Sequence, residues 1–192
     1  GAGTRLGWHH MGNGANLAYR KSAFQAVNGF RGNEHLASGD DMFLIQKMVE
    51  RYPQGVLFLK NRSATVCTEA KADWSSFFQQ RMRWGAKNAA LRSWPMRLAL
   101  LIVFLHSWAI VICAALLLWY LAAEWALLLA FQLTTKAWAD RRFLREMCTW
   151  FGRSDLLRWI APSFFLHIGY IAGVGTASLF FKQYEWKGRV VD

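Results

Sequence analysis

Hydrophobic positions are concentrated in the second half of this chain, in two long runs that contain no Asp, Glu, Lys or Arg. Each run exceeds the roughly 20 apolar residues needed to cross the hydrocarbon core of a bilayer. A third apolar stretch lies between them, but it carries Glu124 and Lys136 and is a weaker candidate. The pattern predicts transmembrane helices at about 98–121 and 159–181, with the weaker third candidate at 122–139.

The first half has shorter apolar runs, separated by polar and glycine-rich segments, and these indicate an α/β arrangement. Apolar or β-branched runs typical of short strands lie at 16–19, 56–59 and 64–68. Helical spacing and residues suited to capping predict helices at 21–27, at about 40–51 and at 73–87. Such an α/β fragment is too short to close a doubly wound sheet alone.

Charge adds an expected orientation in the membrane. The 192 residues carry a formal net charge of +11, yet 54% of them are hydrophobic, which excludes ordinary disorder. The basic residues flank the apolar runs and form no independent patch, so we predict no nucleic-acid partner. The positive-inside rule places the first half in the cytosol, because a basic cluster precedes the first apolar run: Arg81, Arg83, Lys87, Arg92 and Arg97.

The sequence leaves the side of the C-terminus open. If the stretch 122–139 crosses the bilayer, the basic loop that follows it is cytosolic, but the last crossing then leaves a basic tail outside. Either this stretch is not a simple span, or the last apolar run is re-entrant, or a short tail does not follow the charge rule.

The string Gly39-Asp40-Asp41 places two carboxylates where a flexible glycine meets the start of a predicted helix. The free amides and the dipole of a helix start stabilise an ionised carboxylate. Such a carboxylate can accept a proton from a nucleophile, which makes the pair a candidate general base. Two acids at a helix start also serve as ordinary caps, so both interpretations stay open.

A second string, QQRMRW, places an amide, a guanidinium and an indole close together on a predicted helix. Arg83 suits bidentate contact with phosphate, and Gln80 can hydrogen-bond a phosphate or sugar oxygen. Trp84 offers a flat face to the C–H face of a sugar ring. The alternative is an amphipathic helix at the membrane interface, with snorkelling arginines and an indole at headgroup level.

GDD followed about 40 residues later by QxxRW, and then by transmembrane helices, resembles a membrane-integrated family 2 glycosyltransferase. This family contains cellulose, hyaluronan and poly-N-acetylglucosamine synthases. The segments GNGANLAYRKSAF, VNGFRG and YEWKGR also resemble the family. The resemblance implies the C-terminal half of a cytosolic glycosyltransferase A-type α/β domain at 1–93, followed at 94–192 by a helical region of two to three spans and a short basic tail.

The resemblance implies inverting transfer from a nucleotide-diphosphate sugar to a glycan or lipid-linked acceptor. Asp41 falls on the general base that deprotonates the acceptor hydroxyl, and Asp40 on a position that shapes the acceptor site. Gln80 and Arg83 fall on positions that bind the donor pyrophosphate, and Trp84 on one that lines the acceptor terminus. The expected location is the bacterial cytoplasmic membrane, with the catalytic part in the cytosol.

The resemblance further implies a divalent Mg or Mn ion that stabilises the leaving diphosphate in the full-length parent. No D-x-D spacing occurs in the chain, so we expect no metal ligand here. We therefore expect a fragment that lacks the nucleotide-binding half and is inactive alone. Processive and single transfer both remain open. The alternative from another class is a non-enzymatic membrane scaffold subunit whose basic face binds anionic lipid.

Overall fold

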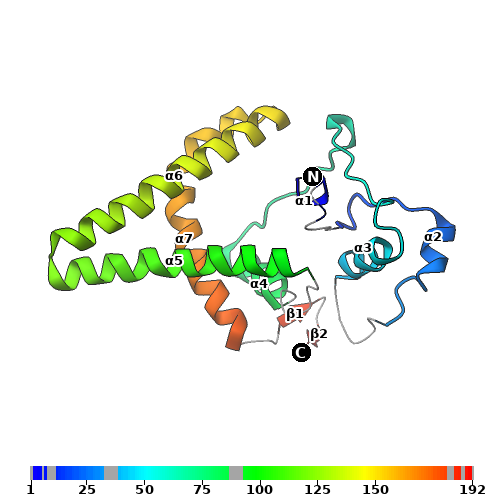
Figure 1. Ribbon diagram of the computed structural model, residues 1–192, viewed down its shortest axis with the longest axis horizontal. Coiled ribbons are helices and arrows are strands. Elements are labelled where there is room, and N and C mark those ends of the chain that lie inside the picture. Colours follow the sequence, from blue (N-terminus) through cyan, green and yellow to red (C-terminus); the bar gives the residue numbers. More distant parts are fainter. Residues whose placement is uncertain are drawn as a thin grey trace. The chain divides into compact units, whose positions relative to one another are not determined.

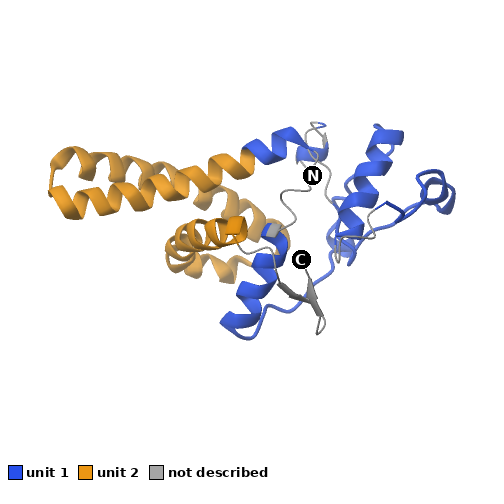
Figure 2. Ribbon diagram, turned by 90° about the horizontal axis from the view of Figure 1, so that it is seen from below, with its two compact units in different colours: residues 1–98, 181–192 blue, residues 99–180 orange. Residues whose placement is uncertain are grey.

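The computed structural model describes residues 2–5, 7, 12–32, 39–86, 93–180, 184–186 and 189–191. They belong to two compact units, which are described separately (Figure 2). Unit 1 comprises residues 1–98 and 181–192, and unit 2 comprises residues 99–180.

Unit 1 consists mainly of short helices joined by irregular segments (Figure 1). Its helices are α1 (Ala2–Arg5), α2 (Lys21–Ala26), the 3-10 helix η1 (Arg62–Ala64) and two longer helices, α3 (Asp40–Arg51) and α4 (Trp74–Ala86). The described strands β1 (Tyr184–Trp186) and β2 (Arg189–Val191) form an antiparallel pair in which Tyr184 lies opposite Val191. The helices α2, α3 and α4 confirm the predictions at 21–27, 40–51 and 73–87, of which Lys87 lies outside the described residues.

The core of unit 1 is one face of α3. Leu44, Ile45 and Met48 are buried there, at the spacing that places side chains on one side of a helix. Leu17 and Phe24 from the preceding segments pack against this face, with further cover from Ala23, Val27, Val49 and Val56. The face is short, but it fixes the position and rotation of α3.

The segment that follows α2 is held against α3 by polar contacts. The Lys47 ammonium donates hydrogen bonds to the carbonyl oxygens of Gly29 and Arg31, the latter at 2.9 Å. Gly29 has φ +52°, and an added Cβ would lie 2.5 Å from Phe24 Cζ, so only glycine fits this turn. The turn thereby closes over the Phe24 ring at the edge of the core.

The predicted α/β glycosyltransferase A-type fold is wrong. The segments 16–19, 56–59 and 64–68 are irregular, and among the described residues the only sheet is the β1–β2 pair. Leu57 and Leu59 are 87% and 70% exposed, so the expected strand at 56–59 buries little apolar surface. A β-branched or apolar run becomes a strand only when a partner pairs with it, and local sequence does not supply that partner.

Unit 2 is built from long helices: most of α5 (Trp94–Tyr120), α6 (Ala123–Phe151), the 3-10 helix η3 (Ser154–Trp159) and α7 (Ile160–Phe180). A two-residue turn, in which Leu121 has φ +50°, joins α5 to α6, and the two helices form an antiparallel hairpin (Figure 1). α6 ends at Gly152, which has φ +68° and closes the helix in the left-handed conformation.

Two segments are long and apolar enough to cross a membrane by length and composition: α5 and the continuous η3–α7 segment, Ser154–Phe180. Their apolar side chains mostly face outward; Leu118 is 78% exposed and Phe165 is 65% exposed. Helices that expose this much apolar surface suit a lipid environment better than a protein core. The predicted spans at 98–121 and 159–181 thus correspond to segments that pass this test.

The third candidate, 122–139, is not a separate helix. It forms the first part of α6, which continues for 29 residues to Phe151 through a strongly charged second half. Within α6 the Lys136 ammonium pairs with Asp140 at 2.6 Å, one helical turn away. Among the described helices, α6 is not one of the two that pass as a membrane span.

Polar contacts join the helices of unit 2. The Trp108 indole N–H on α5 donates to Thr176 Oγ1 on α7 at 3.0 Å. Within the hairpin, the Gln132 amide on α6 donates to Cys113 Sγ on α5 at 3.1 Å. Between apolar helices in lipid, such bonds hold neighbours where burial of apolar surface gives no net driving force.

Candidate functional site

Asp41 lies in the first turn of α3, half-buried and held by two backbone amides. The Gly14 amide donates to Asp41 Oδ2 at 2.7 Å, and the Met42 amide donates to Oδ1 at 2.9 Å. Gly39 precedes the helix with φ +100°, a conformation that favours glycine, and its carbonyl accepts from the Phe43 amide at 3.0 Å. In the GDD string, Gly39 is therefore favoured by its backbone conformation, and Asp41 is held by a tertiary contact with Gly14.

The loop that reaches Asp41 is glycine-rich because it lies against α3. An added Cβ on Gly12 would lie 2.8 Å from Ile45 Cγ1 and 2.9 Å from the Asp41 carbonyl oxygen. An added Cβ on Gly14 would lie 3.7 Å from Asp41 Oδ2, which is an ordinary van der Waals contact. The Asn16 amide anchors the far side of the loop by donating to the Ala64 carbonyl at 2.5 Å. Close packing at Gly12 therefore aims the Gly14 amide at the carboxylate.

Asp40 has a different environment from its neighbour. It is the first residue of α3 and is exposed, and its side chain has no hydrogen-bond or ion-pair partner within the described ranges. The two adjacent acids therefore differ in their contacts and in their exposure to solvent. Asp41 is fixed in the loop contact, and Asp40 projects into solvent beside it.

The helix α4 carries the QxxRW string and begins at a side-chain cap. Asp73 Oδ1 accepts from the Ser76 amide at 2.8 Å, and Asp73 Oδ2 accepts from the Ser76 hydroxyl at 2.7 Å. These hydrogen bonds, the backbone one first, lower the pKa of Asp73 below its usual 3.8. The cap satisfies an amide of the first turn and fixes where α4 starts.

An aromatic and cationic ridge runs along α4, and it includes a residue that the sequence motif does not single out. The Arg81 guanidinium lies 4.9 Å from the centre of the Phe77 ring and 4.5 Å from that of Trp84. These residues stand four and three positions apart, so they meet on one face of the helix. The signal that could have found Arg81 is this spacing of an arginine between two aromatic residues.

The residues of the QxxRW string lie in the second half of α4. Gln80 and Arg83 are half-buried, and Trp84 is 45% exposed with the Arg81 guanidinium beside its ring. Within the part of the chain that is described, the two hydrogen bonds of Asp41 run to Gly14 and Met42, and neither reaches α4. The two motifs are thus held by separate local frameworks.

A divalent cation has no evident ligand set in the described residues. No group of three or more His, Cys, Asp or Glu side chains there is placed to hold a metal ion. The three cysteines are free thiols; Cys113 is buried, Cys148 is partly buried and Cys67 is exposed. The described donors do not fit the expected Mg or Mn ion, so we assign no residue to one.

Comparisons with protein-family models, curated proteins and solved structures find no match to this chain. The resemblance to family 2 glycosyltransferases therefore depends on the motif residues themselves.

Proposed function

We propose that the protein takes part in inverting glycosyl transfer at a membrane, from a nucleotide-diphosphate sugar to a glycan or lipid-linked acceptor. The observation that carries the proposal is the half-buried Asp41 carboxylate, which the Gly14 and Met42 amides hold at the start of α3. A simple cap accepts from the amides of its own helix. Asp41 also accepts from a loop 27 residues away, which fixes its orientation.

Asp41 serves as the general base in this proposal. Each oxygen of an ionised carboxylate has two acceptor positions, and each oxygen of Asp41 receives one backbone N–H. The remaining positions can take the acceptor hydroxyl proton. The acceptor oxygen then forms a bond to the anomeric carbon, while the bond from that carbon to the diphosphate breaks and the diphosphate leaves with the electron pair.

The helix α4 supplies the contacts to donor and acceptor. Arg83 and Gln80 bind the diphosphate, where a planar guanidinium stabilises the charge that builds on the leaving group. Trp84 presents its exposed ring surface to the acceptor sugar. Arg81, placed between Phe77 and Trp84, keeps the indole oriented and is a positioning residue.

The membrane context supports the same function. The α5 segment follows α4 in sequence and is long and apolar enough to span a bilayer. A basic cluster precedes it, which favours a cytosolic position for Asp41 and α4. Nucleotide sugars are cytosolic, and an acceptor that emerges at the bilayer can be extended there. We place the protein in a bacterial cytoplasmic membrane.

The test uses membranes of cells that express the complete reading frame of this protein. These membranes are supplied with a panel of labelled nucleotide-diphosphate sugars, and label is followed into lipid and polymer products. Asp41→Asn keeps the size of the side chain and an oxygen for the Gly14 amide but removes the base, so we expect transfer to fall by about 100-fold or more.

Asp73→Asn is the matched control, because Asp73 also accepts amides at a helix start but lies outside the proposed site. We expect this variant to retain transfer. Undiminished transfer by Asp41→Asn would refute the base assignment. No transfer from any donor would favour the alternative of a non-enzymatic membrane scaffold.

A further inference from the structure

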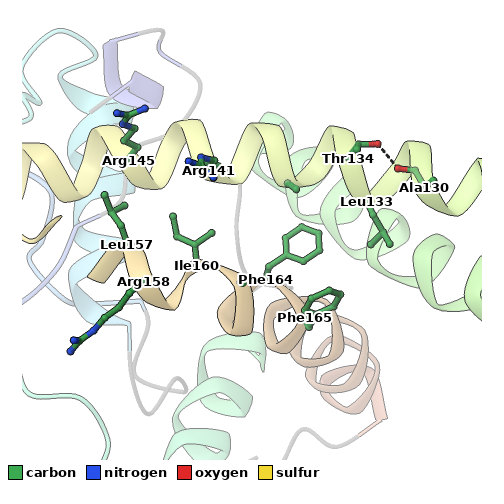
Figure 3. Close-up of a pocket in the computed structure, with 12 residues that line it drawn as sticks. Ala130, Leu133, Thr134, Arg141, Arg145, Leu157, Arg158, Ile160, Phe164 and Phe165 are labelled. Atoms are coloured by element: carbon green, nitrogen blue, oxygen red, sulfur yellow. Dashed lines mark hydrogen bonds between the residues drawn. The ribbon is translucent and has the colours of Figure 1, made fainter. Parts of the chain in front are cut away.

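Unit 2 contains a cavity of about 760 Å³ between α6, η3 and α7 (Figure 3). Cavities of this size are in the range that holds small-molecule ligands. Apolar side chains form most of its wall: Leu133 from α6, and Ile160, Phe164 and Phe165 from α7. In Figure 3, Ile160 and Phe164 project from α7 toward α6 and enclose the apolar part.

One end of the cavity is strongly basic. Arg141 and Arg145 come from successive turns of α6, and Arg158 comes from η3. All three are exposed, and in Figure 3 the Arg145 and Arg158 side chains extend outward from the apolar wall. Guanidinium groups at a mouth of this kind can turn to meet a ligand headgroup.

Among the described side chains, none of these three arginines forms an ion pair. Two of the nearby acids are paired with other cations, Asp140 with Lys136 at 2.6 Å and Asp155 with Arg153 at 3.0 Å. The Asp155 carboxylate, which interacts mainly with Arg153 through their hydrogen bond, also interacts with the nearby charge of Arg158. The residues at this end of the cavity therefore carry a net positive charge, which would attract an anionic group.

The cavity therefore has an apolar part and a cationic end along one direction. The α6 residues that line it extend from Ala130 to Arg145, a length of about 22 Å at 1.5 Å per residue. The part of the wall that α7 supplies belongs to a segment long and apolar enough to span a bilayer, and Arg141 and Arg145 lie in the charged second half of α6. This polarity matches a molecule with one anionic head and a long apolar chain.

We propose that this cavity binds a membrane phospholipid with a net negative headgroup. Arg141, Arg145 and Arg158 hold the phosphate through charge-assisted and bidentate hydrogen bonds. One acyl chain lies along Leu133, Phe164 and Phe165. The site is independent of the proposed sugar transfer, since none of its residues belongs to the GDD or QxxRW string.

Binding is measured by native mass spectrometry of the full chain in a mild detergent, titrated with phosphatidylglycerol or with phosphatidylcholine of the same acyl chains. We expect phosphatidylglycerol to bind at least tenfold more tightly. The double variant Arg141→Gln/Arg145→Gln should weaken phosphatidylglycerol binding about tenfold or more, because each arginine near a headgroup contributes to affinity.

Arg142→Gln is the matched control, since Arg142 is exposed on the same helix but does not line the cavity. We expect it to change the affinity by less than about twofold. Ala161→Leu adds volume to the wall without changing charge and should also weaken binding. Inorganic phosphate, which lacks an acyl chain, should not displace the lipid at millimolar concentration.

Equal binding of the two lipids, or an equal loss in Arg142→Gln and in the double variant, would overturn the proposal. Full displacement by inorganic phosphate together with normal binding by Ala161→Leu would also overturn it, because it would show a phosphate site without a lipid chain. No sugar donor is present in these measurements, so failure of the proposed sugar transfer leaves their outcome unchanged.

Discussion

The Gly14 backbone amide donates a 2.7 Å hydrogen bond to the Asp41 carboxylate, across 27 residues of sequence. The contact forms because Gly12, two residues earlier, lies directly against the first turn of α3. The orientation of the candidate base is therefore decided by a loop that carries no charged side chain of its own.

Gly12→Ala should disrupt this arrangement, whereas Gly14→Ala should not. The new Cβ at position 12 would lie 2.8 Å from Ile45 Cγ1, so the loop or the helix must shift. At position 14 the nearest atom, Asp41 Oδ2, would be 3.7 Å away. We expect Gly12→Ala to destabilise the local structure by about 1–3 kcal/mol and to expose the first-turn amides of α3. Hydrogen exchange at Met42 and Phe43 measures this, and equal exchange in the two variants would contradict the packing argument.

The start of α4 should depend on pH through Asp73. Its pKa is lowered by the hydrogen bond from the Ser76 amide, so the ionised form stabilises the folded helix start. The contribution is complete above the ordinary pKa of 3.8 and is lost as the pH falls through the lower folded-state value. We expect protection of the Ser76 amide, corrected for intrinsic exchange, to be constant near neutral pH and to fall below about pH 4.

Two variants isolate the role of the Asp73 charge. Asp73→Asn keeps an oxygen acceptor and should show no such acid transition, whereas Asp73→Ala should leave the Ser76 amide weakly protected at every pH. An unchanged acid transition in Asp73→Asn would assign the effect to another group.

Gly175 should be intolerant of a side chain, unlike Gly173 on the same helix. A Cβ at Gly175 would lie 2.6 Å from Phe104 Cδ2 on α5, whereas none of the described atoms lies within 4 Å of one at Gly173. We expect Gly175→Ala to lower stability by about 1–3 kcal/mol, with little effect of Gly173→Ala. Thermal unfolding in detergent compares them. Addition of Phe104→Ala should make the Gly175→Ala step less costly, and strict additivity would contradict the contact.

The indole of Trp108 and the hydroxyl of Thr176 should be coupled. Trp108→Phe removes the donor, and Thr176→Val removes the acceptor while nearly keeping its shape. A double-mutant cycle should give a coupling of about 0.6–1.7 kcal/mol, the range of hydrogen bonds between helices in membranes. Thr176→Ser keeps the hydroxyl and should behave like the native protein. A coupling near zero would show that the bond contributes nothing to helix association.

Helix positions could be predicted because their signals are local. Asp40 begins α3 and Asp73 caps α4, and both helices follow the apolar spacing of their own residues. The strand predicted at 56–59 does not form, because a strand needs a partner from elsewhere in the chain and local sequence does not show whether one is present. Leu57 is instead 87% exposed in an irregular segment.

The candidate site, like the fold, could be predicted only where its signals are local in sequence. The carboxylate of Asp41 and the Gln80, Arg83 and Trp84 string could be found as motifs, since their spacing is visible along the chain. The role of Gly14 could not, because the amide that holds Asp41 is a backbone group placed by contact across 27 residues. The spacing of Arg81 between Phe77 and Trp84 is also visible along the chain, but only the structure shows that its guanidinium lies against both rings.

From the chain alone, α2, α3, α4 and the two segments able to span a membrane could be predicted, because hydrophobic period, run length and capping residues act over one helix at a time. Only the folded structure shows that the apolar runs of the first half form no sheet, that Gly14 holds Asp41, and that three arginines line one end of a largely apolar cavity. These features depend on which distant segments meet, and that depends on packing over the whole unit.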